Sequence, residues 1–429
     1  MTEKLPFAIT LDPGTSLANE TGSWRTNRPV YLDRLPPCNN ACPAGENIQQ
    51  WLFHAEEGDY FTAWQKLMED NPLPGVMGRV CYHPCEDACN RAELDEAVGI
   101  HAVERFLGRQ AWEHKWVPDC AAEPSGKRVL VVGAGPSGLS AAYHLTRLGH
   151  DVTIREAGPM AGGMMRFGIP KYRLPRDVLD YEIQRILDMG VTLQLDTKVD
   201  DIEAAFTAEK FDAIFVAVGA HLAKRIDIPA HAAGKILDAV SVLRDMETGA
   251  EPPQLGRRVI VYGGGNTAMD VARTAKRLGV DSSMIVYRRS RDEMPAHDFE
   301  ATEAEEEGVM IHWLRTIKQI DETTFTVEKM EIDVNGRPQP TGEFEEIEAD
   351  TLILALGQDV DTSFLDETLG VEVAKDGVVS VNAQMMTGRD GLFAGGDMVP
   401  SERTVTVAVG HGKKAARHID AWLKGESYE

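Results

Sequence analysis

Apolar and polar residues follow two different patterns along the chain, and the change falls near residue 120. Residues 47–70, NIQQWLFHAEEGDYFTAWQKLMED, carry apolar side chains at helical spacing. A segment rich in helix breakers, VPDCAAEPSGK, follows at residues 117–127. From Lys127 onward, short β-branched runs alternate with helical patterns, which is typical of a parallel sheet in an α/β fold. The sequence therefore predicts a helical domain over residues 1–120, followed by an α/β region.

The α/β region contains an internal repeat. The segments KRVLVVGAGPSGLSAAYHLTRLG at 127–149 and RRVIVYGGGNTAMDVARTAKRLG at 257–279 share a basic start, an apolar strand, a glycine turn and a helix. Two weaker strands also resemble each other, AIFVAVGAH at 213–221 and TLILALGQD at 351–359. Two nucleotide-binding domains are the simplest explanation of both similarities.

Length and charge narrow the class of protein. A chain of 429 residues is too long for one hydrophobic core and predicts two or three domains. No apolar run approaches the ~18 residues of a membrane span, and the first residues lack a signal-peptide pattern, so we expect a cytoplasmic protein. The net charge of −24 argues against a nucleic-acid partner. The acidic run EATEAEEEG at 300–308 is interpreted as the solvated face of a helix rather than a docking surface.

The first glycine turn has the pattern of a dinucleotide site. Gly133, Gly135 and Gly138 form G-x-G-x-x-G between a strand and a helix. Such glycines permit the tight turn, the approach of a pyrophosphate and close packing of the helix on the strand. Glu156 ends the second strand, 23 residues beyond Gly133, where a carboxylate accepts hydrogen bonds from both ribose hydroxyls. These residues predict dinucleotide binding.

The second glycine turn differs in its second strand. Gly263 and Gly265 are followed by Ala268 in place of the last glycine. Where an NAD site usually presents a carboxylate, this chain has Arg288 and Arg289, which suit a 2′-phosphate and favour NADP(H). A solvated arginine pair, or an arginine stacked on adenine, is the alternative.

A third glycine segment, GLFAGGDMVPSERTVTVAVGHG, lies near the C-terminus at 391–412. We expect a strand to end at Gly396, Asp397 to follow, and a helix to begin near Thr404. An acid at a strand end beside glycines suits the ribityl or phosphate groups of a flavin.

All six cysteines precede residue 121. Disulfide scaffolds are usually small secreted chains, so clustered cysteines in this chain point to a metal site. Disulfide reductases of related fold place a redox-active cysteine pair beside the flavin, and this chain has no cysteine after Cys120. The segment CYHPCEDAC at 81–89 is therefore the candidate electron outlet.

In combination, GAGPSGL, AGGMMRFGIPKYRLP, GGGNTAMD, VYRRSRDEMPA, ALGQD and FAGGD resemble the small subunit of glutamate synthase and its relatives, including the N-terminal half of dihydropyrimidine dehydrogenase. The resemblance covers residues 38–420. It implies two Rossmann-like domains: an FAD domain, 127–225 and 350–429, interrupted by an NAD(P)H domain, 226–349. It further implies FAD contacts at Gly133, Gly135, Ser137, Gly138, Glu156, Gly163, Met164, Gly396, Asp397 and Thr404. The implied NAD(P)H contacts are Gly263, Gly265, Asn266, Thr267, Arg288 and Arg289.

Members of this family carry two [4Fe-4S] clusters in the N-terminal domain, and here the match is incomplete. The chain supplies Cys38, Cys42, Cys81, Cys85 and Cys89, but has Val30 and Asp33 where the fuller pattern has cysteines. Each all-cysteine cluster needs four thiolates, so we predict one cluster rather than two. Relatives sometimes take a fourth ligand from the next helix, and Glu104 matches that position. The pattern leaves open which four residues bind.

Zinc is the competing metal, because cysteines four residues apart with His83 nearby could form a tetrahedral site. The Cys42–Pro43 pair and the predicted flavin favour the cluster. Cys120, in the segment between the domains, is interpreted as an ordinary thiol.

The resemblance implies hydride exchange between NAD(P)H and FAD, with single electrons passing between FAD and the cluster. Such transfer depends on stacking and orientation, so no catalytic side chain is predicted. Residues 27–49, NRPVYLDRLPPCNNACPAGENIQ, also resemble flavoprotein subunits of 2-oxoacid oxidoreductases such as phenylglyoxylate dehydrogenase. We therefore expect a subunit of an electron-transfer complex whose partners carry iron–sulfur clusters, with that complex ranked ahead of glutamate synthase. A stand-alone NAD(P)H reductase without a cluster, and a non-enzymatic scaffold, are the alternatives.

Overall fold

The computed structural model describes residues 35–119, 122–224, 226, 228–231, 235–249, 251, 253–366 and 368–426. Val30, Asp33 and Cys120, to which the sequence assigned roles, lie outside the described residues. No helix within the described ranges combines the length and the apolar character needed to cross a membrane.

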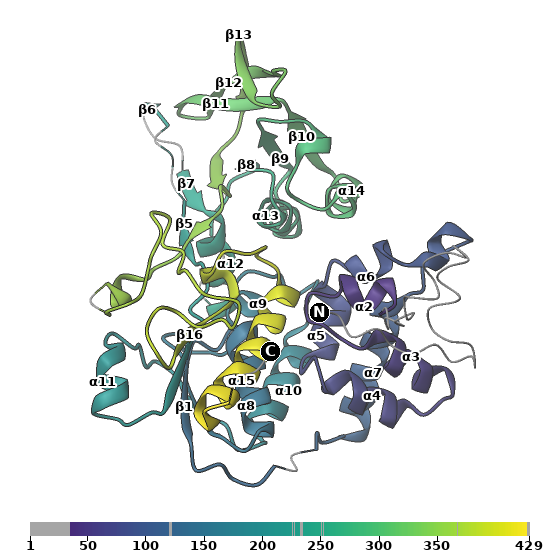
Figure 1. The fold of residues 1–429 in the computed structure, drawn as a ribbon. Helices are drawn as coiled ribbons and strands as arrows, with labels where there is room; N and C mark the ends of the chain where they lie inside the picture. Colours follow the sequence, from purple (N-terminus) through teal and green to yellow (C-terminus); the bar gives the residue numbers. More distant parts are fainter. Residues whose placement is uncertain are drawn as a thin grey trace, which may run out of the picture.

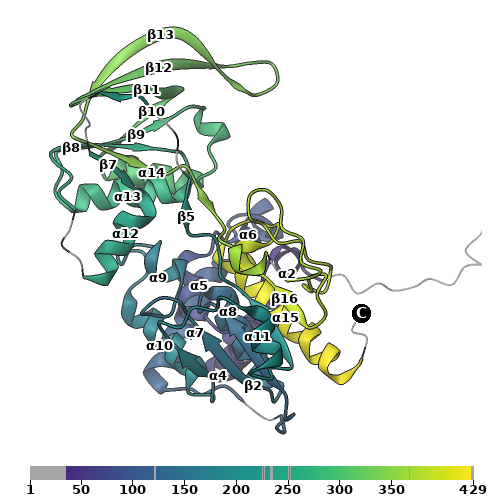
Figure 2. The ribbon, with the colours of Figure 1, turned by 90° about the vertical axis from the view of Figure 1, so that its left-hand side faces the viewer.

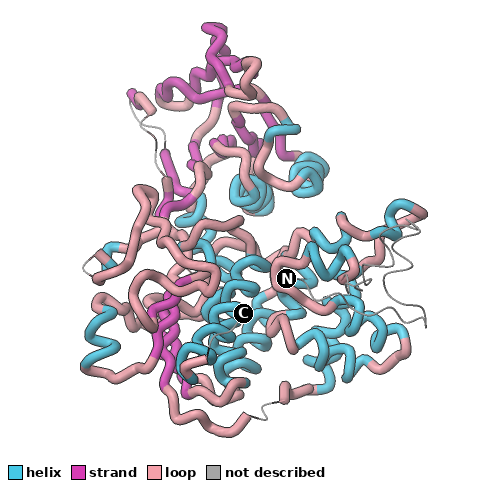
Figure 3. Tube along the Cα trace, viewed as in Figure 1, coloured by secondary structure: helices cyan, strands magenta, loops and turns pink. Residues whose placement is uncertain are grey.

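The N-terminal region is helical, as predicted (Figures 1 and 3). The expected helical stretch at 47–70 forms two helices, because Gly58 at φ +78° ends the first one. Its helices share one hydrophobic core with the first sheet, in which Trp51, Trp64 and Leu107 are fully buried. The helices are α2 (Pro37–Ala41), α3 (Ile48–Glu56), α4 (Tyr60–Met68), α5 (Pro74–Val80), α6 (Pro84–Asp87) and α7 (Ile100–His114).

The first α/β unit is a five-stranded parallel sheet in the order β16-β4-β1-β2-β3. Its edge strand β16 comes from the C-terminal part of the chain. The residues of the second unit are therefore inserted within the sequence of the first unit. The strands are β1 (Arg128–Val132), β2 (Asp151–Arg155), β3 (Thr192–Gln194), β4 (Ala213–Val216) and β16 (Leu392–Ala394). The helices are α8 (Pro136–Arg147), α9 (Met164–Phe167), α10 (Arg176–Leu187), α11 (Ile202–Thr207) and α15 (Val405–Lys424).

The second α/β unit repeats this plan with a parallel sheet in the order β10-β9-β8-β14-β7. β14 lies beside β8 as β4 lies beside β1, so the similarity of the two weaker strands is structural. The strands are β7 (Lys235–Asp238), β8 (Arg258–Tyr262), β9 (Ser282–Tyr287), β10 (Val309–Trp313) and β14 (Thr351–Leu354). The helices are α12 (Ala239–Thr248), α13 (Asn266–Arg277) and α14 (Asp298–Glu306).

β14 belongs to the second sheet although the expected boundary between the domains is residue 350. The second sheet therefore ends one strand later than that boundary. A further sheet of four strands covers this unit at the top of Figure 1, in the order β13-β12-β11-β6. Its strands are β6 (Ala230–His231), β11 (Arg315–Asp321), β12 (Thr324–Ile332) and β13 (Pro338–Glu348). The short antiparallel pair β5 (Leu222–Ala223) and β15 (Gln358–Asp359) lies where the chain passes between the two units (Figure 2).

The acidic run is solvated at Glu303, Glu305 and Glu306, as expected, but not at Glu300. Glu300 on α14 is fully buried and pairs with Arg173 of the first unit at 2.6 Å. Glu303 and Glu307 pair with Arg273 on α13. The run thus holds α14 against its neighbours, because buried carboxylates require cationic partners.

Candidate functional site

A cavity of about 1410 Å³ lies at the carboxyl ends of strands from both parallel sheets. In open α/β sheets, ligands bind in this position. Every predicted cofactor residue except Gly138 lines the cavity, so the structure brings the three glycine segments together around one space.

The three glycines of the first turn are required for two different reasons. Gly133 has φ +105°, and a Cβ there would lie 2.5 Å from the Ala217 carbonyl oxygen. A Cβ on Gly138 would lie 2.0 Å from the Gly133 carbonyl oxygen. At Gly135, however, the nearest atom to a built Cβ is the Gly163 Cα at 3.9 Å. Packing within the chain therefore requires Gly133 and Gly138, whereas Gly135 leaves free space in the cavity wall.

Glu156, at the end of β2, is joined to this turn. Its two carboxylate oxygens accept hydrogen bonds from the Ala134 and Gly158 amides, both at 2.8 Å. The carboxylate therefore lies in the cavity wall beside the start of α8, as expected for a group that contacts a ribose.

Ser137, in the first turn of α8, has a buried hydroxyl without a hydrogen-bond partner among the described residues. Buried hydroxyls are normally hydrogen-bonded, and the start of a helix favours an anion. Gly396 approaches the same residue from the C-terminal segment, since a Cβ on it would lie 3.1 Å from the Ser137 Cβ. The unpaired hydroxyl and the adjoining space suit the pyrophosphate of a dinucleotide.

Gly163 and Met164 close the wall opposite the glycine turn. Gly163 has φ +52°, and a Cβ on it would lie 2.8 Å from the Gly135 Cα, which explains a glycine at this position. Met164 begins α9 and lines the cavity.

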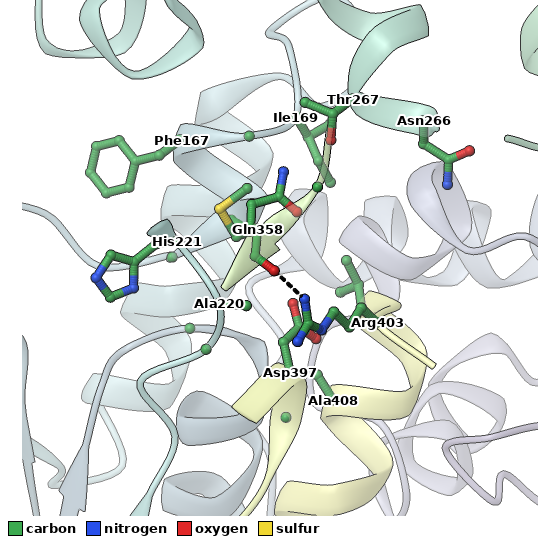
Figure 4. A pocket seen from close by; sticks show the side chains of 18 of the residues that line it. Phe167, Ile169, Ala220, His221, Asn266, Thr267, Gln358, Asp397, Arg403 and Ala408 are labelled. Atoms are coloured by element: carbon green, nitrogen blue, oxygen red, sulfur yellow. Dashed lines mark hydrogen bonds between the residues drawn. The ribbon is translucent and has the colours of Figure 1, made fainter. Parts of the chain in front are cut away.

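Asp397 and Arg403 lie beside each other where the C-terminal segment of the chain lines the cavity (Figure 4). Burial raises the pKa of Asp397 to about 6, and the charge of Arg403 partly opposes this effect. Arg403 Nη1 donates to the Gln358 carbonyl oxygen at 2.6 Å. Thr404 caps α15 by accepting from the Val407 amide at 3.2 Å, so the helix begins at the predicted residue.

The second glycine turn has the same backbone relation to its sheet as the first. Gly263 has φ +150°, and a Cβ there would lie 2.2 Å from the Ala355 carbonyl oxygen after β14. No atom lies within 4 Å of a Cβ built on Gly265, which again leaves space for a ligand. Thr267 lines the cavity in the first turn of α13 (Figure 4).

Arg288 and Arg289 directly follow β9 and line the cavity. Arg288 is exposed and Arg289 is half-buried. Neither guanidinium has a hydrogen bond or ion pair with the residues that the structure describes, in contrast to Arg291, which pairs with Asp298 and Glu305. The pair is thus available to an anionic ligand.

Asn266 connects the second turn to the N-terminal domain. Its side-chain amide donates to the Tyr82 hydroxyl at 2.6 Å, and its oxygen accepts from the His297 amide at 3.2 Å. Tyr82 also stacks on the His297 ring at 3.7 Å. Sequence reasoning missed Tyr82, although it lies within CYHPCEDAC, because its partners come from a distant part of the chain.

The five described cysteines lie on neighbouring segments, since α2, which carries Cys38, packs against α6, which carries Cys85. Burial, and then neighbouring negative charge, raise the pKa of the Cys42 and Cys85 thiols, and the buried Glu104 carboxylate contributes to both shifts. Cys81 contributes to the raised pKa of Cys85. Burial also raises the pKa of Cys38, with a smaller contribution from Cys89.

The spacing of the thiols favours a cluster over zinc. Among the described residues, the metal-ligand groups that gather within 4.8 Å belong to His83, Glu86 and His101, and no three cysteines gather in this way. Tetrahedral zinc bound at about 2.3 Å would need sulfurs within roughly 4 Å of one another. In a cubane each thiolate binds a different iron, so its cysteines stand further apart. The His83 and His101 rings stack at 3.9 Å, and His101 Nδ1 contacts a carboxylate oxygen of Glu86 at 2.8 Å.

The fold and the cavity define an oxidoreductase that uses a flavin and a nicotinamide dinucleotide. Comparisons with known proteins agree. Residues 127–412 match the pyridine nucleotide-disulphide oxidoreductase family, and residues 26–116 match dihydropyrimidine dehydrogenase domain II, 4Fe-4S cluster. The chain belongs to the pyridine nucleotide-disulphide oxidoreductase family, in the branch of the glutamate synthase small chains. It is an FAD-dependent NAD(P)H oxidoreductase with an N-terminal 4Fe-4S domain.

Three relatives are similar over most of this chain. The NADP(+)-dependent formate dehydrogenase subunit beta of Moorella thermoacetica is 39% identical, covering 90% of this chain and 60% of its own length. The NADPH-Fe(3+) oxidoreductase subunit beta of Geobacter sulfurreducens is 37% identical, and the match covers 93% of this chain and 65% of that protein. The glutamate synthase [NADPH] small chain of Escherichia coli (strain K12) is 32% identical, covering 91% and 89%. The chain thus spans less than two thirds of the length of the formate dehydrogenase and NADPH-Fe(3+) oxidoreductase subunits.

The fold is also that of Mycobacterium tuberculosis FprA, whose complex with NADPH superposes with a TM-score of 0.58 at 17% identity. That match covers 71% of this chain and 84% of FprA.

Proposed function

We propose that this chain exchanges hydride between NADP(H) and FAD, and passes single electrons to or from one [4Fe-4S] cluster within a larger complex. The observation that carries the proposal is the position of α15. Its N-terminal residues line the flavin cavity, and Thr406 in the same first turn contacts Cys81.

In this proposal, residues 127–225 and 350–429 hold FAD and residues 226–349 hold NAD(P)H, with β14 completing the second sheet. The free space at Gly135 and the unpaired Ser137 hydroxyl support the pyrophosphate position. Bound FAD would supply the change from hydride chemistry to one-electron chemistry. Glu156, Asp397 and the start of α15 would fix its orientation. The unpaired Arg288 and Arg289 support NADP(H), and the names of the three relatives specify it as well.

The cluster would be held by Cys42, Cys81, Cys85 and Glu104, with Cys38 and Cys89 left as bystanders. The proximity of these four groups and the burial of Glu104 support this ligand set. Residues 1–120 would accordingly form an iron–sulfur domain with one cluster.

For the complex, we retain a 2-oxoacid oxidoreductase of the phenylglyoxylate dehydrogenase type as the proposed assembly. Glutamate synthase and an NADP-dependent formate dehydrogenase are the competing assemblies, since relatives carry those names.

The test is iron and acid-labile sulfide per FAD on anaerobically purified protein. One cluster predicts about four of each. C85A should abolish the cluster, whereas the matched variant C89A should retain it. About eight of each would indicate two clusters. Absence of sulfide, with zinc in its place, would leave a stand-alone NAD(P)H reductase.

A further inference from the structure

One face of α15 holds both cysteine loops. Thr406, Gly410 and Lys413 recur at the spacing of one helical face. A Cβ on Gly410 would lie 2.2 Å from the Pro43 carbonyl oxygen, next to Cys42. Lys413 Nζ donates to the Gly45 carbonyl oxygen at 2.9 Å. The loop that carries Cys42 is therefore fixed against the helix.

Thr406 contacts the other loop. Its Oγ1 donates a hydrogen bond to Cys81 Sγ at 3.1 Å. Its side chain is buried, and Cys81 also accepts from the His83 amide at 3.4 Å. Among the described side chains, Thr406 is thus the one that donates a hydrogen bond to a sulfur atom of the proposed cluster ligands.

The same helix reaches the cavity and the first dinucleotide helix. Thr404, Val405 and Ala408 line the cavity. A Cβ on Gly412 would lie 2.3 Å from the Ser137 carbonyl oxygen on α8. α15 also packs along α8. Thr406 therefore lies within a short segment, residues 404–408, that touches both the cavity and Cys81, and Val80 and Tyr82 on either side of Cys81 line the cavity as well.

We propose that Thr406 is a positioning residue that sets the reduction potential of the cluster through its hydrogen bond to Cys81. This inference rests on the proposed function. Reduction adds one electron to the cluster, with no bond formed or broken. A hydrogen bond donated to a ligand sulfur favours the more negative reduced form, so it raises the potential.

The test is a potentiometric titration with dithionite, followed by the EPR signal of the reduced cluster in the full-length protein. T406V, which removes the hydroxyl at constant shape, should lower the potential by about 59 mV or more, a tenfold change in a one-electron equilibrium constant. T406S keeps the donor and should restore it. T274V is the matched control, because Thr274 is a buried threonine of α13 whose hydroxyl has no partner among the described residues.

An unchanged potential in T406V, in protein that contains the cluster, would overturn the inference and leave the proposed function intact. If T406V loses the cluster, the potential is measured in T406A, which is smaller and also lacks a hydroxyl. An unchanged potential in T406A would likewise overturn the inference. Wild-type protein without iron and sulfide would instead refute the proposed function, and this inference with it.

Discussion

The Asn266 side-chain amide donates a hydrogen bond to the Tyr82 hydroxyl at 2.6 Å, although the two residues lie 184 positions apart. Asn266 begins the helix after the second glycine turn, and Tyr82 follows the proposed ligand Cys81. The contact therefore joins the second α/β unit to the cysteine loop.

We expect Y82F and N266A to be energetically coupled. A neutral hydrogen bond contributes about 0.5–1.5 kcal/mol, so the double variant should lose less stability than the sum of the single variants by about that amount. Urea unfolding of the four proteins measures the coupling. Y143F is a useful control, because the Tyr143 hydroxyl donates to the Met68 carbonyl oxygen instead. Additive losses for Y82F and N266A would contradict the prediction.

The glycines of the first turn should respond differently to substitution. G135A places its methyl group in free space, so the chain should fold normally but lose most of its FAD. G138A places the methyl group against the Gly133 carbonyl oxygen, so it should lower the melting temperature of the protein itself. Flavin absorbance per chain and thermal unfolding separate the two effects. Full FAD occupancy in G135A would argue against a pyrophosphate at this turn.

R289A should weaken NADPH binding much more than NADH binding. Hydrogen bonds to a charged group contribute about 1.5–3 kcal/mol, which corresponds to roughly a tenfold to hundredfold loss for NADPH. Steady-state KM values for both dinucleotides measure the difference. R291A is the control, since the Arg291 guanidinium is already paired with Asp298 and Glu305. Equal losses for both dinucleotides in R289A would eliminate the 2′-phosphate interpretation.

The raised pKa of Asp397 predicts that the folded, FAD-free chain loses stability as the pH rises and this carboxyl group ionises. Burial raises this pKa from 3.8 to about 6, so the folded state binds the proton more tightly than the unfolded state. The stabilisation from the protonated form is complete below about pH 4 and is lost as the pH rises through 6. FAD-free D397N should therefore be more stable than wild type at pH 7, by about 1–3 kcal/mol, and similar to it at pH 4.

Urea unfolding at the two pH values measures this, and FAD retention in D397N should fall at the same time. D361N is a control of opposite sign, because a hydrogen bond from Ser363 lowers the pKa of Asp361. A D397N variant that is less stable than wild type at pH 7 would contradict the account.

The sequence by itself determined the two dinucleotide units and the metal-binding N-terminal region. Glycine spacing is readable because Gly133 and Gly263 must adopt positive φ beside a neighbouring strand, a local requirement that leaves a fixed residue pattern. The start of α15 at Thr404 was equally readable, since a capping side chain acts within one turn.

Only the tertiary structure decided how these parts meet. The contact of Tyr82 with Asn266 and the hydrogen bond from Thr406 to Cys81 join segments far apart in the chain. The burial of Glu300 against Arg173 was hidden for the same reason, because an acidic run looks solvated until its partner is known. Long-range pairing leaves no periodic signal in one sequence, so these relationships became visible only in the folded chain.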